Sequence, residues 1–178
     1  METRENQYKS YLSTIPKSCR KKKLSEKNLL KIKKILVAID KSGYKDKAVS
    51  YAFTLAKSLG AEINIIHVID QSSMVIAGSA HPSASIMAQR EYQDALEQDA
   101  DKLLKEIVQL GKKEGIIVHD EVLAGTSVKQ KILDYAKDKN ADLIIVGTKG
   151  ITGIKKFLMG SVANDIIAHA HCPVLAVR

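Results

Sequence analysis

Short apolar runs alternate with longer amphipathic stretches along most of the chain. Five runs rich in Ile, Val and Leu cover residues 33–40, 61–70, 116–125, 141–147 and 172–178. Continuous apolar runs of this length are typical of parallel strands that are buried on both faces. The pattern therefore predicts five buried strands.

Four stretches between these runs place apolar residues three or four positions apart, which is typical of helices with one buried face. They cover residues 42–60, 85–113, 127–140 and 161–171, whereas residues 71–84 are small, poorly patterned and predicted to form a loop. Gly60 is expected to end the first helix, and Thr126 or Ser127 to cap the third. The buried face of the second helix is expected to contain Ala95, Leu96, Leu103, Leu104, Ile107 and Leu110.

The resulting order, β-α-β-α-β-α-β-α-β, favours the α/β class, with an open parallel sheet and helices on both faces. In such sheets ligands bind beyond the carboxyl ends of the strands, where the strand order reverses. The strand ends are therefore the first candidates for a site. They fall at Ala38-Ile39-Asp40, His67-Val68-Ile69-Asp70, Ala124-Gly125 and Val146-Gly147.

Glycines follow the fourth strand instead of the first. The chain has neither a G-x-x-x-x-G-K-[ST] motif nor a G-x-G-x-x-G motif after its first strand, which excludes two familiar phosphate-binding loops. Gly147, Gly150 and Gly153 would let the backbone approach an anion, and the Ser161 hydroxyl would share one focus with the amides of Val162 and Ala163. The alternative is an ordinary turn at Gly147 and a plain helix cap at Gly160 and Ser161.

The same segment resembles the nucleotide-binding signature of the universal stress protein family, G-x2-G-x9-G-[ST]. Gly147, Gly150, Gly160 and Ser161 match it at every interval, and the resemblance extends over about Lys33 to Arg178. The first strand with Asp40, the HVID that closes the second strand and the terminal CPVLAVR are similar to the family too.

The resemblance implies a Rossmann-like open parallel five-stranded sheet of order 3-2-1-4-5, a homodimer paired through the last strand, and ATP as the ligand. It places Ala38, Ile39 and Asp40 at the adenosine end, with the backbone of Val68 against the adenine. Gly147, Gly150 and Gly160 would surround the ribose and phosphates, and Ser161 and Val162 would contact the phosphates. The expected binding set also includes Val146, Lys149, Gly153 and Ala163. Asp40 would accept from a ribose hydroxyl or help to hold Mg²⁺, and these two roles stay open.

Two features depart from the family pattern. Ala38 stands where some ATP-binding relatives have proline, which would leave the adenine pocket looser. Lys149, Lys155 and Lys156 add three cations to the loop, which would favour a polyphosphate or would simply be solvated.

The net charge of +8 is concentrated at the N-terminus, where residues 1–34 hold eleven Lys or Arg against three Glu. We expect residues 1–31 to be a flexible basic extension, with Ser25 as the cap of a short helix within it, and residues 32–178 to form the domain. An arm for nucleic acid or acidic lipid headgroups is the alternative.

No apolar run approaches the roughly 18 residues of a membrane span, and the N-terminus lacks the apolar region of a signal peptide. Cys19 and Cys172 lie far apart and show no metal-ligand spacing. We therefore expect a cytoplasmic protein with reduced thiols that does not contact the membrane.

Three other groups of residues carry weaker signals. His67 is interpreted as a hydrogen-bonded histidine of the core, in preference to a catalytic base. His169, His171 and Cys172 invite a metal site, but two histidines two positions apart at a helix end point in different directions. Asp40 and Asp70 end neighbouring strands and would form a carboxylate pair if they were catalytic. The alternative is that each is a turn residue, because Asp is common at strand ends. We assign no catalytic residue and no metal ligand.

Three functions follow from the sequence. The leading one is an ATP-binding regulatory or stress-response module that changes its conformation or partner with the nucleotide. The second is a slow ATPase or phosphotransferase at the same site, which would need a base that no residue clearly supplies. The third is a nucleic-acid-associated protein that uses the basic N-terminal arm.

Overall fold

The computed structural model describes residues 31–40, 45–72, 86–148 and 159–178. Apart from Lys31, these residues belong to one unit, Ile32–Arg178. Its elements are β1 (Lys34–Ile39), α2 (Lys45–Leu59), β2 (Glu62–Asp70), α4 (Ile86–Lys113), β3 (Val118–Gly125), α5 (Val128–Asp138), β4 (Leu143–Gly147), α6 (Ser161–His169) and β5 (Val174–Val177). The predicted alternation of strands and helices is confirmed.

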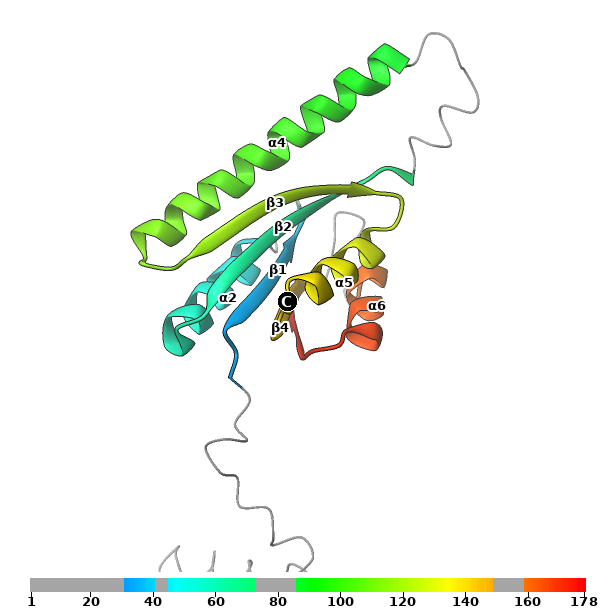
Figure 1. Cartoon of the computed structure of the whole chain (residues 1–178). Helices are drawn as coiled ribbons and strands as arrows, with labels where there is room; N and C mark the ends of the chain where they lie inside the picture. Colours follow the sequence, from blue (N-terminus) through cyan, green and yellow to red (C-terminus); the bar gives the residue numbers. More distant parts are fainter. Residues whose placement is uncertain (1–30, 41–44, 73–85, 149–158) are drawn as a thin grey trace, which may run out of the picture. The chain divides into compact units, whose positions relative to one another are not determined.

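The five strands form one parallel sheet in the order β3-β2-β1-β4-β5 (Figure 1). The predicted Rossmann-like architecture and its 3-2-1-4-5 order are therefore confirmed. The strand order reverses between β1 and β4, because the chain moves outward from β1 in one direction and then returns to its other side. The carboxyl ends of these two strands mark the place where a ligand is expected.

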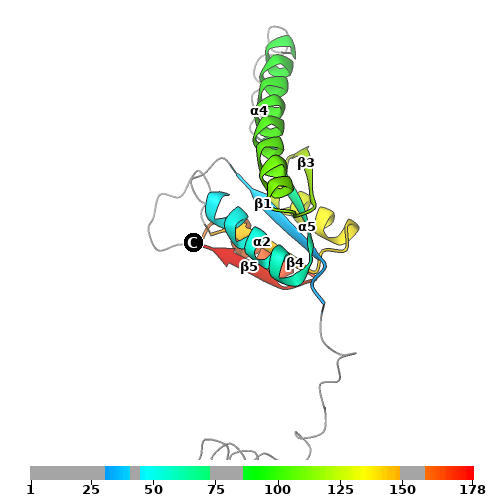
Figure 2. The same ribbon diagram turned by 90° about the vertical axis from the view of Figure 1, so that its left-hand side faces the viewer.

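Alternate residues of the strands supply two separate cores, as the two-residue period of a strand requires. Ile35, Val37 and Ile145 face α2 and α4, whereas Leu36 and Ile144 face α5 and α6. Figures 1 and 2 show these helices on the two sides of the sheet, with β5 at its edge beside β4. Because both faces are covered, the central strands need the unbroken apolar runs that the sequence shows.

Three helices end in the same way. Gly60 and Gly115 have φ of +65° and +71°, and Asn140 has φ of +53°, so each lies in the left-handed region. The next amide in each case returns to the helix: Ala61 to Ala56, Ile116 to Gly111 and Ala141 to Ala136. This hydrogen bond is that of the Schellman motif, which satisfies a carbonyl at the helix end and turns the chain into the following strand. The predicted stop at Gly60 is confirmed.

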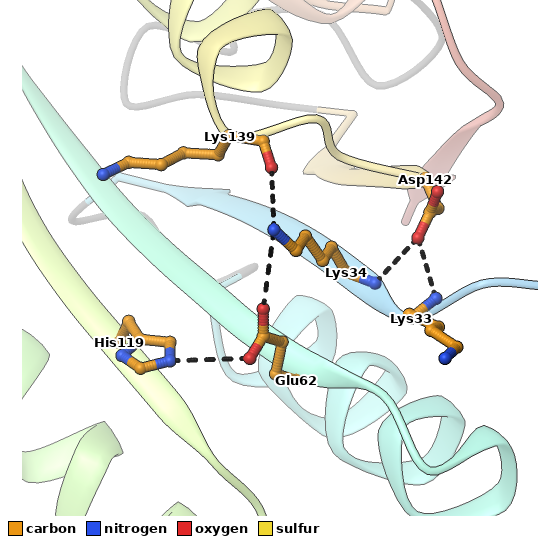
Figure 3. Close-up of polar contacts among 6 residues, drawn as sticks. All are labelled: Lys33, Lys34, Glu62, His119, Lys139 and Asp142. Atoms are coloured by element: carbon orange, nitrogen blue, oxygen red, sulfur yellow. Dashed lines mark hydrogen bonds and ion pairs between the residues drawn. The ribbon is translucent and has the colours of Figure 1, made fainter.

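Asp142 fixes the start of β1 at the amino end of the sheet. Its Oδ2 accepts hydrogen bonds from the backbone amides of Lys33 and Lys34, at 2.8 and 2.9 Å (Figure 3). The Nζ atom of Lys34 approaches the carbonyl oxygen of Lys139 and the carboxylate of Glu62, which also pairs with His119. This polar cluster lies at the amino ends of the strands, whereas the cavity described below lies at their carboxyl ends.

Several elements are shorter in the structure than the sequence predicted. Helix α6 ends at His169 because Ala170 adopts an extended conformation, with φ −65° and ψ 142°. Ala95 and Leu110 of α4 are exposed, whereas Leu104 and Ile107 are buried as predicted. The beginning of α4 lies beyond the end of β3, so the sheet does not cover its face there (Figure 1). Strands β3 and β5 are shorter than expected, and Ser25 and most of the predicted loop 71–84 lie outside the described residues.

Candidate functional site

A cavity of about 150 Å³ lies at the carboxyl ends of the strands, where the strand order reverses. Strands β1, β2 and β4 supply one side of it, and the first turns of α5 and α6 supply the other. The site predicted from topology is therefore a hollow that both strands and helices line.

Ten of the thirteen predicted binding residues line this cavity: Ala38, Ile39, Asp40, Val68, Val146, Gly147, Gly160, Ser161, Val162 and Ala163. The other three, Lys149, Gly150 and Gly153, lie outside the described residues. The structure thus brings together two groups that are far apart in the sequence, the strand ends and the start of α6. The contacts of all thirteen with a nucleotide stay a prediction.

Two lining residues, Val128 and Ile132, were missed by the sequence reasoning. They lie one helical turn apart on α5, so both point to the same side of the helix. The predicted amphipathic pattern of residues 127–140 contained the signal, because Ile132 belongs to the buried stripe with Tyr135 and Ala136.

The α6 end of the cavity exposes unpaired backbone amides. Gly160 caps the helix without a side-chain hydrogen bond, and the first amide to bond within α6 is that of Asn164, to the Gly160 oxygen at 3.0 Å. Within the described part of the chain, the amides of Ser161, Val162 and Ala163 have no acceptor. Free amides and the positive end of the helix dipole favour an anion at this point.

Thr148 and Gly160 hold together the two ends of the glycine segment. The Gly160 amide donates to the Thr148 oxygen at 2.7 Å, and the Thr148 amide donates to the oxygen of Val177 in β5 at 2.8 Å. The buried hydroxyl of Thr148 has no hydrogen-bond partner in the described structure. The segment from β4 to α6 therefore starts and finishes at one point beside the cavity.

His67 braces the carboxyl end of β1. Its Nδ1 lies 2.9 Å from the carbonyl oxygen of Ile39, which is a cavity residue, and the side chain is buried. Because a carbonyl oxygen only accepts, Nδ1 carries the proton of this hydrogen bond. The interpretation of His67 as a hydrogen-bonded core histidine is confirmed.

The remaining candidates do not form a reactive cluster. Asp40 lines the cavity, whereas the Asp70 carboxylate accepts from the amide of Ser72 at 2.9 Å, as a turn residue does. His169 bonds through Nδ1 to the oxygen of Asp165 in its own helix. Among the described residues there is no group of three or more His, Cys, Asp or Glu placed to hold a metal ion.

Burial raises the pKa of the Cys172 thiol, and the charge of Asp142 raises it further. Burial also raises the pKa of Tyr135, with a contribution from its hydrogen bond to Glu121. Neither residue lines the cavity. None of the helices described here is both long and apolar enough to cross a bilayer.

Fold and cavity together define an open parallel α/β protein with a hollow at its topological switch point, the place where such folds bind ligands. The family model described as the universal stress protein family matches residues 31–178. The chain belongs to this family, as its glycine signature indicated.

A curated relative from Methanocaldococcus jannaschii, universal stress protein MJ0531, is 35% identical over 146 residues, which are 82% of each chain. The solved universal stress protein UspA from Lactobacillus plantarum superimposes with a TM-score of 0.73 at 26% identity, covering 83% of this chain and 99% of that one. A universal stress protein from Archaeoglobus fulgidus, solved in complex with dAMP, shares the fold with a TM-score of 0.56 at 24% identity, covering 82% of this chain and 98% of that one.

Proposed function

We propose that this protein is a cytoplasmic ATP-binding module whose conformation or partner changes with the bound nucleotide. The observation that carries the proposal is the cavity itself. It unites the apolar ends of β1, β2 and β4 with the first amides of α6, for which the described residues provide no acceptor.

The two ends of the cavity suit the two ends of a nucleotide. Ala38, Val68 and Val146 offer an apolar surface to a base, and such pockets are mostly apolar with few polar groups. Ser161 and the amides that follow it offer donors to phosphate oxygens. A phosphate group and a flat ring joined by a sugar would match both surfaces at once.

Asp40 is the acidic residue among those that line the cavity. Mg²⁺ is usually bound by one or two carboxylates together with substrate phosphates, so one carboxylate beside the phosphates would fit such an ion. A ribose hydroxyl is the other partner that suits a carboxylate acceptor. Titration of an Asp40→Asn variant with and without Mg²⁺ separates the roles, because only a metal role makes the loss depend on the ion.

The proposed module is a homodimer paired through β5. This strand lies at the edge of the sheet and pairs with β4 on one side. The carbonyl oxygens of Pro173 and Val177 point toward β4, so by the two-residue period Val174 and Ala176 present their backbone groups to the open edge. An unpaired edge of this kind is a template for a second strand.

Two backbone hydrogen bonds connect the candidate site with the edge strand β5. Thr148 donates to Val177 of β5 and accepts from Gly160, which lines the cavity. A nucleotide that repositions Gly160 would therefore act on β5 through one intervening residue. This connection is the physical basis that we propose for a nucleotide-dependent change of partner.

Mass spectrometry of the small molecules that co-purify with the protein tests the proposal. We expect ATP, and we expect it to be absent from a Gly160→Val variant that folds normally. An empty site that also fails to take up added ATP would contradict the proposal. Phosphate release above that of the Gly160→Val control would instead favour the alternative, a slow ATPase at the same cavity.

A further inference from the structure

Helix α5 forms a wall of the cavity that the glycine signature and the strand ends do not include. Val128 and Ile132 line the cavity from this helix, one turn apart on the same side. Ile132 is 3% exposed and packs in the core with Leu36, Ile66 and Ile144. Val128 is half-buried at the start of the helix. Ile132 is therefore held by the core, whereas the size of the side chain at position 128 can change with less effect on core packing.

The position of this wall is fixed by polar contacts. The Ser127 side chain caps α5 by accepting from the Gln130 amide at 3.4 Å, which sets where Val128 begins the helix. Lys129 then pairs with Asp165 of α6 at 2.8 Å. This ion pair joins the first turn of α5 to the helix whose amides open the other end of the cavity. The two helices that line the cavity are thus linked at the surface by this ion pair.

The size of the cavity matches one flat ring system. An engineered cavity of about 150 Å³ lined by aliphatic side chains binds a benzene ring, and the cavity here has a volume of about 150 Å³. Val68, Val146, Val128 and Ile132 contribute apolar side chains to its lining. With one ring system inside this volume, the sugar and phosphates would have to extend out of it, past Gly160 and Ser161.

We propose that α5 determines which nucleobase this protein accepts, with Ile132 as the floor and Val128 as the adjustable side wall of a base pocket. The inference rests on the proposed function, because it assigns the base of the proposed nucleotide to the apolar part of the cavity. Val128 acts by size and shape: a larger side chain there leaves room for a smaller base, and a smaller one leaves a void.

The test compares the affinities of ATP and CTP for three variants by titration of the nucleotide-free full-length protein. Val128→Phe fills part of the pocket and should lower ATP affinity by about tenfold or more, because even a methylene-sized misfit in an apolar pocket costs about tenfold. CTP affinity should fall less, so the preference for ATP over CTP shrinks. Val128→Ala should lower ATP affinity by about tenfold through the void that it leaves. Leu133→Phe is the matched control, since Leu133 lies on the same helix and packs in the same core but does not line the cavity.

The outcomes distinguish this inference from the proposed function. ATP binding that is weakened by both Val128 variants, with a reduced preference for ATP in Val128→Phe and no change in Leu133→Phe, supports the inference. ATP binding that both Val128 variants leave unchanged overturns it, as does an equal loss for ATP and CTP in Val128→Phe. Absence of ATP binding in the wild-type protein overturns the proposed function itself. Val128→Ala keeps the test valid if Val128→Phe fails to fold.

Discussion

The backbone amide of Gly160 donates a hydrogen bond to the carbonyl oxygen of Thr148 over 2.7 Å, and this contact joins the end of β4 to the start of α6. Gly147 and Gly160, the first and last glycines of the signature, both line the cavity. Thr148 and Gly160, the described residues that directly follow β4 and directly precede α6, therefore lie next to each other.

Replacing Gly160 by proline removes the amide that bonds to Thr148. The φ of Gly160 is −62°, which both proline and alanine adopt without strain. Relative to Gly160→Ala, Gly160→Pro should lower the free energy of unfolding by about 1 kcal/mol, the net value of a hydrogen bond. ATP affinity should fall further in the proline variant than in the alanine variant. Urea unfolding and ATP titration measure both effects, and equal behaviour of the two variants would show that the contact is dispensable.

Loss of the Asp142 carboxylate should lower the free energy of unfolding and leave ATP affinity unchanged. Its carboxylate accepts from two backbone amides at the edge opposite to the cavity. Asp142→Ala removes charge-assisted hydrogen bonds and should lower the free energy of unfolding by about 1.5–3 kcal/mol. Under conditions in which the variant is fully folded, its ATP affinity should equal that of the wild type. Asp138→Ala, which removes an exposed carboxylate of the same helix-to-strand region, is the control and should change neither quantity.

A dimer paired through β5 would use the backbone amide of Ala176. Ala176 presents its N–H to the open edge of β5, so Ala176→Pro removes an edge donor without breaking a bond to β4. We expect a dimer in the wild type and a monomer in the variant, measured by sedimentation at matched concentrations, with the same far-UV circular dichroism spectrum for both proteins. A variant that stays dimeric would place the interface elsewhere.

Cys172 should be a poorly reactive thiol. Burial and the nearby Asp142 raise its pKa, so the thiol stays protonated and less of the reactive thiolate forms near neutral pH. In a Cys19→Ser background, alkylation by iodoacetamide at pH 8 should be slower in the folded protein than in urea. Because the folded pKa is the higher one, this group stabilises the fold below its unfolded pKa, and that contribution is lost as the pH rises through the folded value. Equal alkylation rates in the two states would refute the assignment.

The sequence predicted most of the fold because its signals are local. Unbroken apolar runs and Gly60 at a left-handed helix end specify strands and stops within a few residues. The end of α6 was harder to predict, because the extended Ala170 is followed by His171 and Cys172, without a strong breaker before Pro173. The exposure of Ala95 could not be predicted either, since it depends on how far the sheet reaches along α4.

The candidate site was predictable in part. Residues of the glycine signature and the strand ends are recognisable from spacing and topology, and ten of them meet in one cavity. Val128 and Ile132 carry no such signature, because an aliphatic residue on a helix face looks the same whether it packs in the core or lines a pocket. Only the packing of α5 against the sheet separates the two cases.

Calorimetric titration of the nucleotide-free protein with ATP is the most direct test of the central claim. We predict one ATP bound per chain in the wild type, and a loss of affinity of about tenfold or more in Gly160→Val, whose side chain would enter the cavity. Gly160→Ala should fall between the two, because it adds less volume at a backbone angle that all residues adopt. Absence of binding in the wild type, or equal affinity in all three proteins, would contradict the assignment of the cavity as an ATP site.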